Sequence, residues 1–397
     1  MAPTLATTAD SPGRQIGLCA ERGSRSLGAV RILWLYGAPG TGKSTTAWAT
    51  LNLLSDSGER AAHVDIDQLG MVYPAPAGDP YADNLKGEAL RVTAETLADL
   101  GVETLVVSGV LYPESLAFYE EQLGAFPLAL VRLVVAQDEQ RRRIDQRGVW
   151  AADWADVVEA NDELDDAALT HPVIATEGGA PKAVAEQALA GASYRTAHPP
   201  AAIDLSAPDD AGQAILFGGA PVVGKSTIAW QAFLATRAVT RTAFLDIRQL
   251  GFVGRDGGEP DHTVQALVAG ALWDLFRARG ARLLILNGTV ESPSDVGLYA
   301  ARLRATPLAA VRLVADRDAL MARATERTGG TGPSLAGDTL RGASADAIER
   351  AVAETLARQE DVAGDPAFPT FDTNGRTAQD SALLVLRQHV LRLALDS

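Results

Sequence analysis

Two short segments of the sequence have the residue types and the spacing of a loop that binds phosphate. Each has a glycine, four further residues and then Gly-Lys-Ser, at positions 37–44 and 219–226. In such a loop the glycines let backbone N–H groups point toward a phosphate, the lysine reaches the β- and γ-phosphates, and the serine hydroxyl is a ligand for Mg²⁺. The alternative for a single match is a glycine-rich turn before a capped helix. Two matches, each between an apolar run and a helical pattern, favour binding of a nucleoside triphosphate.

The candidate ATP-binding residues of these loops are Gly37, Gly40, Thr41, Gly42, Lys43, Ser44 and Thr45 in the first, and Gly219, Gly224, Lys225, Ser226 and Thr227 in the second. Only four of the 35 basic residues are lysines, and two of the four are Lys43 and Lys225. We expect Lys43 to act in catalysis as well as in binding, and Ser44 and Ser226 to be ligands for Mg²⁺.

The two loops belong to a longer internal repeat. The segments that start at Gly37, Val64 and Pro127 return at offsets of 182, 181 and 180 residues, in the same order, and 9 of 12 loop positions are identical. A period this long is that of a duplicated domain and not of a solenoid. The sequence therefore predicts a flexible segment (residues 1–29), a first copy (30–192), a linker rich in Pro, Ala and Asp (193–211) and a second copy (212–397).

Each copy alternates short apolar runs with helical patterns. In the first copy the runs at 32–36, 61–66, 104–107 and 129–135 are short enough for buried strands, and helical patterns at 43–54, 84–100, 114–123 and 139–147 separate them. Strands that are apolar throughout and alternate with helices indicate a parallel sheet covered on both faces. The expected fold class is α/β, with two tandem domains that each contain a mainly parallel sheet flanked by helices.

Carboxylates follow the second predicted strand of each copy. Asp65 and Asp67 end this strand in the first copy, and Asp246 takes the place of Asp65 in the second. Carboxyl ends of parallel strands lie beside the phosphate loop, so we interpret Asp65 and Asp246 as Mg²⁺ ligands and Asp67 as the base that acts on an acceptor hydroxyl. The alternative is a pair of solvated acids at a strand end.

Paired arginines follow the fourth predicted strand of each copy. Arg143 and Arg147 are four residues apart, hence on one face of a helix, and Arg323 and Arg327 repeat them. Such a pair suits a lid that closes over a triphosphate and neutralises charge during transfer. The alternative is a solvated basic face of a helix.

The loop at residues 71–81 of the first copy is rich in Pro and Gly and is followed by Lys86. We interpret Tyr73 and Lys86, together with Asp67, as candidate substrate-binding residues. A surface lysine is the equal alternative for Lys86.

These motifs resemble the small-molecule kinase branch of the P-loop proteins, the group that includes shikimate, gluconate and adenylylsulfate kinases. The resemblance is carried by residues 37–44, the Asp65-x-Asp67 strand end, the lid arginines and the final strand end at residues 372–376. The chain is similar also to P-loop proteins of high-GC bacteria with an Asp-Ile-Asp-Gln-Leu-Gly-Met segment. The resemblance implies kinase-like domains with five-stranded sheets, ATP and Mg²⁺ as cofactors, and transfer of the γ-phosphoryl group to a hydroxyl of a small molecule.

The two copies differ at positions that matter for this chemistry. Asp67 aligns with Arg248, Lys86 with Gln265, and the Gly40-Thr41 pair with two valines. Because an arginine cannot act as a base, we expect the first copy to be catalytic and the second to bind nucleotide in a structural, regulatory or specialised role. A nucleotide-dependent switch or scaffold, with two ATP sites and no metabolite acceptor, is the alternative function.

Composition narrows the partners. The 397 residues carry a formal charge of −15 and a single cysteine, Cys19. The acidic balance disfavours nucleic acid and anionic membrane as partners, and also a polynucleotide kinase or nucleic-acid toxin. No run approaches the 18 or so apolar residues of a membrane span. We expect a cytoplasmic protein with contact between its two copies. The oligomeric state, ATP or GTP preference and the acceptor are left open.

Overall fold

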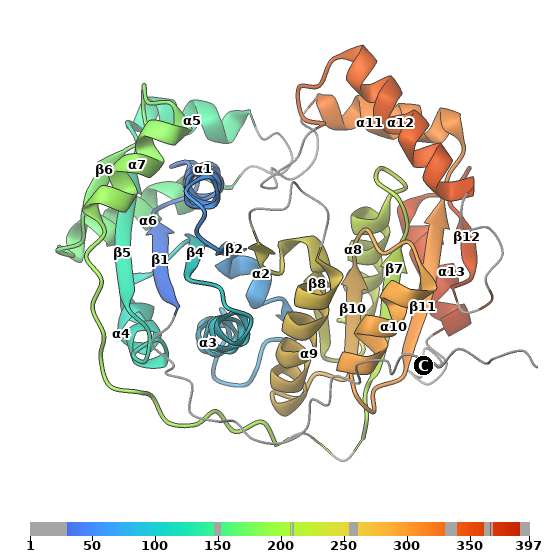
Figure 1. Ribbon diagram of the computed structural model, residues 1–397, viewed down its shortest axis with the longest axis horizontal. Coiled ribbons are helices and arrows are strands. Elements are labelled where there is room, and N and C mark those ends of the chain that lie inside the picture. Colours follow the sequence, from blue (N-terminus) through green and yellow to red (C-terminus); the bar gives the residue numbers. More distant parts are fainter. Residues whose placement is uncertain are drawn as a thin grey trace, which may run out of the picture.

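The computed structural model describes residues 30–146, 152–206, 208, 210–253, 261–329, 340–360, 366 and 368–389, so residues 1–29 lie outside the described part of the chain. Two six-stranded sheets lie side by side (Figure 1). The first has the order β6 (Val173–Ala175), β5 (Leu128–Val134), β1 (Arg31–Tyr36), β4 (Thr104–Gly109), β2 (Ala61–Asp65) and β9 (Phe252–Val253). The second has the order β12 (Thr370–Asp372), β11 (Leu308–Val314), β7 (Gln213–Gly218), β10 (Leu283–Asn287), β8 (Thr242–Asp246) and β3 (Val72–Tyr73).

In each sheet the five strands that come from one copy are parallel. The loop-bearing strand, β1 or β7, is at the centre of its five. Alternate residues of β1 enter different apolar clusters: Trp34 packs in one, and Leu33 and Leu35 in the other. Both faces of the strand are therefore buried, as its continuous apolar sequence requires. The expected α/β class with five-stranded parallel sheets is confirmed.

Helices cover both faces of the sheets (Figure 1). Those of the first copy are α1 (Lys43–Asp56), α2 (Ile66–Leu69), α3 (Asp83–Asp99), α4 (Pro113–Gln122), α5 (Gln137–Asp145), α6 (Trp154–Asp166) and α7 (Pro181–Gly191). Those of the second are α8 (Lys225–Thr236), the 3₁₀ turn η3 (Ile247–Gln249), α9 (His262–Ala278), α10 (Pro293–Arg302), α11 (Arg317–Thr328), α12 (Ala345–Glu360) and α13 (Ala378–His389). Helix α5 lies at the upper left of Figure 1, above the first sheet, and α11 and α12 lie at the upper right, above the second.

The two copies exchange edge strands. Strand β9 of the second copy pairs antiparallel with β2 of the first, and β3 of the first copy pairs antiparallel with β8 of the second. The N–H of Phe244 donates to the carbonyl of Met71 at 2.9 Å beside the second pairing. Each sheet is thus completed by two residues from the other copy. The domain boundaries remain a prediction, and these two short strands cross them.

An apolar cluster joins the copies behind the exchanged strands. It includes Leu90 and Leu97 of α3 together with Leu272 and Trp273 of α9, and the two helices pack on each other at the centre of Figure 1. At its rim Arg279 donates to both carboxylate oxygens of Glu88, at 2.8 and 2.5 Å. Because burial of apolar side chains is the main driving force for folding, this shared cluster makes the stability of each copy depend on the other.

We expect the fragment 30–206, expressed alone, to unfold without a cooperative transition or at a much lower temperature than the full chain. It lacks β9 and exposes the apolar face of α3, and exposed apolar faces and unpaired strand edges favour aggregation. Calorimetry and binding of a hydrophobic dye to the fragment and the full chain measure the difference. A monomeric fragment with the melting temperature of the full chain would contradict the expectation.

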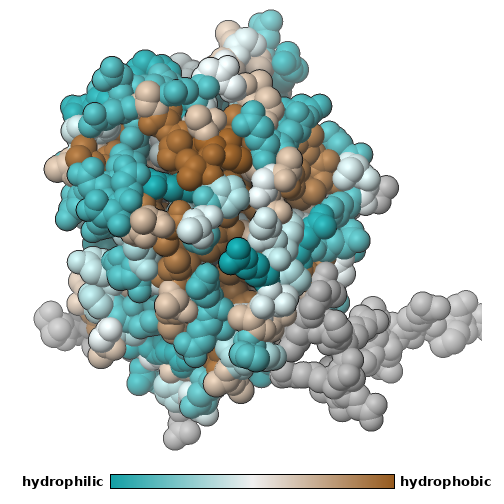
Figure 2. Space-filling view, turned by 90° about the vertical axis from the view of Figure 1, so that its left-hand side faces the viewer, coloured by the Kyte–Doolittle hydropathy of each residue, from teal (hydrophilic) through white to brown (hydrophobic). Residues whose placement is uncertain are grey.

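The outer surface of the first copy, on the side of the edge strand β6, is mainly hydrophilic with apolar patches between the polar residues (Figure 2). Val173 of β6 is 56% exposed. Within the described residues no helix combines the length and the apolar character needed to span a membrane.

Candidate active site

The first phosphate loop follows β1 and leads into α1. Gly42 precedes the helix with φ of 92°, a left-handed conformation that favours glycine. The Lys43 ammonium donates to the carbonyl of Ala38 at 2.9 Å, and the Thr41 hydroxyl donates to the same oxygen at 2.9 Å. The lysine therefore curls back over its own loop, in the position from which it reaches a bound phosphate.

The second loop has the same shape despite its different sequence. Gly224 has φ of 95°, and Lys225 donates to the carbonyl of Ala220 at 2.6 Å. Val222, which aligns with Gly40, has φ of 67°. A β-branched residue in the left-handed region costs about 1–3 kcal/mol, so the surrounding structure holds this loop in the phosphate-binding shape against local strain.

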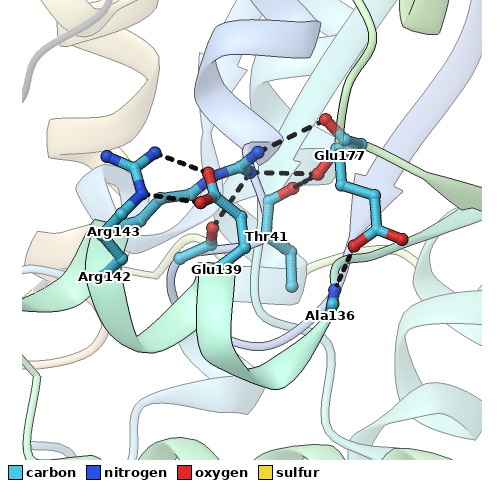
Figure 3. A network of polar contacts seen from close by, with 8 residues as sticks. Thr41, Ala136, Glu139, Arg142, Arg143 and Glu177 are labelled. Atoms are coloured by element: carbon cyan, nitrogen blue, oxygen red, sulfur yellow. Dashed lines mark hydrogen bonds and ion pairs between the residues drawn. The ribbon is translucent and has the colours of Figure 1, made fainter.

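Arg143 of α5 points at the first loop and binds protein atoms there (Figure 3). Its guanidinium donates to the hydroxyl of Thr176 at 3.0 Å and to the Glu139 carboxylate at 2.8 Å. Thr176 in turn donates to the carbonyl of Thr41 at 2.8 Å. Arg143 thus ties the helix after β5 and the chain after β6 to the loop, and this clamp was not anticipated from the lid interpretation. Its predicted partner Arg147 lies outside the described residues.

The second copy repeats the clamp. Arg323 donates to the carbonyl of Val223 at 2.9 Å and to the hydroxyl of Thr373 at 3.0 Å. Arg327, one turn further along α11, acts electrostatically on both Lys225 and Asp246. Of the two arginines of this copy that the sequence assigns to a lid, Arg327 is therefore the one whose charge acts on Lys225. Sequence reasoning missed Thr176 and Thr373, although both directly follow the last strand of their copy.

Asp65 lies at the end of β2, beside the first loop. Its carboxylate accepts hydrogen bonds from the Ser108 hydroxyl at 3.0 Å and from the Asp67 N–H at 3.1 Å. The buried His63 ring shares a 3.0 Å hydrogen bond with the same hydroxyl. Burial, with a smaller contribution from the charge of Asp67, raises the pKa of Asp65 to about 6, and the nearby Lys43 opposes the rise. Asp65 and Lys43 are thus brought together, as the sequence predicted.

We expect Asp65→Asn to stabilise the nucleotide-free protein at pH 8 by about 1–3 kcal/mol and to change little near pH 3, below the pKa of the unfolded carboxyl. A carboxyl whose folded pKa is raised binds its proton more tightly in the folded state, so the native protein loses stability as pH rises from about 4 to about 6. Asparagine carries no charge, so the variant does not lose stability in this way as the pH rises. Urea unfolding without Mg²⁺ at the two pH values measures it, with the exposed Asp56→Asn as control. A less stable variant at pH 8 would contradict the expectation.

A cluster of charged side chains lies beside α2 and the start of α3, where the sequence predicts an acceptor site. The Lys86 ammonium is 3.3 Å from Asp67 and 3.7 Å from Asp83. Burial lowers the pKa of Lys86, but the two carboxylates outweigh it, so the pKa lies above its usual value. Burial and the charge of Asp67 raise the pKa of Tyr112. We call Asp67, Lys86, Asp83 and Tyr112 the acceptor cluster.

The Lys86 side chain is mostly buried and its ammonium is ion-paired with Asp67 and Asp83, so it differs from an exposed surface lysine. Its binding of an acceptor stays a prediction. Asp83 and Tyr112 were missed. The spacing of three between Asp83 and Lys86 at the start of a helical pattern is the signal that would have found Asp83.

Tyr73 is placed elsewhere. It lies in β3, opposite Thr242 of the second copy, with its ring 5.9 Å from that of Phe233 and 5.6 Å from the Arg237 guanidinium. The loop that was expected to shape the acceptor pocket thus sends this side chain to the contact between the copies. Tyr73 does not join the acceptor cluster.

The second copy has a different set of groups at the corresponding positions. Gln265 is buried and accepts a hydrogen bond from Tyr299 at 3.3 Å. Burial raises the pKa of Asp246 to about 6, against the charges of Arg248, Lys225 and Arg327. Burial lowers the pKa of Lys225 to about 8, and the carboxylate of Glu291 limits the fall. Glu291, which follows β10, is an acid near this loop that the sequence analysis did not single out.

Oxygen ligands beside each loop fit Mg²⁺. A serine hydroxyl begins the helix after each loop, and a carboxylate whose ionised form is costly ends the next strand: Ser44 with Asp65, and Ser226 with Asp246. Mg²⁺ commonly takes one or two protein oxygens and completes its shell with water and phosphate. Within the described residues no group of three or more His, Cys, Asp or Glu is placed to hold a metal ion.

Comparison with known proteins gives structural neighbours only. Scans of family models and of curated proteins found no match. A gluconokinase from Sinorhizobium meliloti 1021 is 19% identical over 42% of this chain and 92% of its own, with a TM-score of 0.30. The APS kinase of Mycobacterium tuberculosis, solved with AMPPNP and APS, is 20% identical over 41% and 95%, with a TM-score of 0.31. The tunicamycin resistance protein of Deinococcus radiodurans is 21% identical over 43% and 99%, with a TM-score of 0.31.

Gluconate and adenylylsulfate kinases, which the sequence motifs resemble, are thus among the structural neighbours of the chain. Each of the three covers less than half of this chain and nearly all of its own. At these identities and TM-scores the likeness concerns the fold, and the chemistry has to be argued from the residues.

Proposed function

We propose that the chain is an ATP-dependent phosphotransferase whose first copy transfers the γ-phosphoryl group of ATP to a hydroxyl of a small molecule. The observation that carries the proposal is the acceptor cluster beside the first loop. Asp67 is held 3.3 Å from a cation, at the end of the same strand turn that carries Asp65. A second carboxylate, paired with a cation close to Asp65, suits the binding and deprotonation of an acceptor hydroxyl.

The proposed reaction uses these groups as follows. The loop amides and Lys43 hold the phosphates and neutralise charge as it develops on them. The acceptor oxygen forms a bond to the γ-phosphorus, the bond from that phosphorus to the β,γ-bridging oxygen breaks, and ADP leaves with the electron pair. Asp67 takes the proton of the acceptor hydroxyl, and the Lys86 ammonium, 3.3 Å away, orients that carboxylate. Ser44 and Asp65 would hold Mg²⁺, which when bound would neutralise charge on the phosphates.

Arg143 has a positioning role in this proposal, because its guanidinium binds Thr176 and Glu139. It fixes the loop that binds the triphosphate. A lid role for Arg147 remains a prediction from the sequence.

A screen of small metabolites for acceptor-dependent release of ADP tests the proposal, followed by mass detection of the phosphorylated product. Rapid ADP release that requires one acceptor supports a kinase. Slow hydrolysis that no acceptor accelerates would overturn the proposal and favour a nucleotide-dependent switch or scaffold. The observation that favours this alternative is Arg248, which stands in the second copy where the first has the carboxylate of Asp67.

We expect calorimetry with AMPPNP and Mg²⁺ to find two sites per chain, because both copies keep the loop shape and the lysine-to-carbonyl contact. Lys225→Ala is expected to leave one site. A stoichiometry of one in the unaltered protein that Lys225→Ala does not change would show that the second loop no longer binds nucleotide.

A further inference from the structure

The second copy has lost the two carboxylates of the acceptor cluster and has gained a guanidinium in place of one of them. At the three positions of the acceptor cluster on α2 and α3, the second copy has Arg248 for Asp67, His262 for Asp83 and Gln265 for Lys86. Two carboxylates and one ammonium are replaced by one guanidinium, one imidazole and one amide. The formal charge of the three positions changes from −1 to +1, with the imidazole counted as neutral.

The positive groups are held close to one carboxylate. The backbone N–H of Arg248 donates to Asp246 at 3.0 Å, which fixes this residue beside the strand end. The charges of Arg248, Lys225 and Arg327 all act on Asp246. Glu291 also acts on Lys225, so three cations stand against two acids and the net charge of the group is positive. At a site enclosed by protein a ligand anion interacts with such a charge more strongly than in water.

A buried hydrogen-bond donor faces the same strand end without a partner. Asn287 is 1% exposed, and its side-chain nitrogen has no hydrogen-bond partner among the residues that the structure describes. It is in register with Asp246 on β8, as Ser108 is with Asp65 in the first copy. Ser108 donates to its aspartate, whereas the Asn287 amide is left unsatisfied. Such a group is costly unless a ligand oxygen accepts its hydrogen bond.

The conformation of the second loop also indicates a retained binding site. Val222 is held in a left-handed conformation between the buried core residues Ala220 and Val223. Strain of this kind persists at sites where the local shape binds a ligand. The second copy has therefore kept a phosphate-binding loop while losing the carboxylate that acts on a hydroxyl.

We propose that the acceptor side of the second copy binds a phosphomonoester, with its phosphate paired to the Arg248 guanidinium next to the nucleotide in the second loop. An arginine presents a planar fork of donors that matches the oxygens of a phosphate. The inference rests on the proposed function in one respect only. Phosphoryl transfer to a hydroxyl in the first copy yields a phosphomonoester, and the positive charge of the second copy suits a ligand of that class.

The test is calorimetric titration of orthophosphate into the full chain saturated with AMPPNP and Mg²⁺, at constant ionic strength. We expect one orthophosphate per chain. Arg248→Asp, which restores the residue type of the first copy, should weaken orthophosphate binding at least tenfold, and Arg248→Lys should weaken it less. Arg304→Asp, with the same charge change at an exposed arginine, is the matched control and should leave the affinity unchanged.

Three results would overturn the proposal: no orthophosphate binding in the saturated protein, equal affinity in Arg248→Asp, or loss of one AMPPNP site together with orthophosphate in that variant. Two competitors distinguish the sources of the phosphate group. Displacement of orthophosphate by AMP assigns the site to nucleotides, and displacement by ribose 5-phosphate assigns it to sugar phosphates. These titrations need no acceptor, so a failed metabolite screen and a failed phosphate site are separate outcomes.

Discussion

We expect Lys43→Ala to lower turnover by at least about 10²–10³, and Lys225→Ala to lower it by less than about tenfold. Both lysines donate to the carbonyl of the alanine five residues earlier, at 2.9 and 2.6 Å, so the two substitutions remove matched contacts. The two copies differ in the residue that follows the strand beside the loop. This residue is Asp67 in the copy of Lys43 and Arg248 in the copy of Lys225. Only a carboxylate accepts the proton of an acceptor hydroxyl, because the guanidinium stays protonated.

Steady-state assays of the two variants, with the acceptor found in the screen, measure this difference. Calorimetry with AMPPNP on each variant separates lost binding from lost chemistry, since each should retain one nucleotide site. Equal loss of turnover in both variants would indicate two working sites or one composite site. Loss in Lys225→Ala alone would reverse the assignment of the catalytic copy.

The phosphate loops and the parallel sheets were predictable because their signals are local. A Gly-x₄-Gly-Lys-Ser segment between an apolar run and a helical pattern contains nearly all the residues that shape the loop, and the loop in the structure has the expected form. The strands could be predicted for the same reason. A run such as residues 32–36, buried throughout, has few alternatives once helices flank it on both sides.

The exchanged strands could not be predicted in this way. Val72 and Tyr73 were expected to lie in a loop, because Pro and Gly surround them and two residues give no alternating pattern. Their partners on β8 are about 170 residues away in the chain, and no local property of the sequence pairs them. This is also why the contacts of Tyr73 with the second copy could not be predicted. Its position is set by a strand of the other copy, which decides what its ring contacts.

Arg143 shows a second limit of prediction from sequence. Its spacing from Arg147 predicts a shared helix face but does not indicate which residues that face contacts. The partner of Arg143 is Thr176, which follows β6 and becomes a neighbour only when β6 joins β5 in the sheet. A charged side chain near a phosphate loop was therefore assigned to the ligand, whereas in the structure its donors are used by Thr176 and Glu139.

Asp67→Asn is expected to lower kcat by about 10²–10⁴ and to leave the affinity for AMPPNP within about threefold. Asparagine keeps the size of the side chain but accepts no proton. Lys86 loses one of its two carboxylates and keeps Asp83 at 3.7 Å, so the acceptor cluster is not left with an unpaired buried ammonium. Single-turnover assays with the acceptor, together with nucleotide calorimetry, measure the two quantities separately.

Asp83→Asn is the matched control for this variant. It removes the other carboxylate of Lys86 and the acceptor of the Ser115 hydroxyl, so it perturbs the same ion pair from the opposite side. If Asp67 acts only by holding Lys86, the two variants should lose activity to a similar extent. If Asp67 takes the proton, Asp67→Asn should lose far more. A variant Asp67→Asn that loses AMPPNP binding but retains turnover would place Asp67 with Asp65 among the Mg²⁺ ligands, because a ligand of the metal affects the nucleotide before it affects the acceptor.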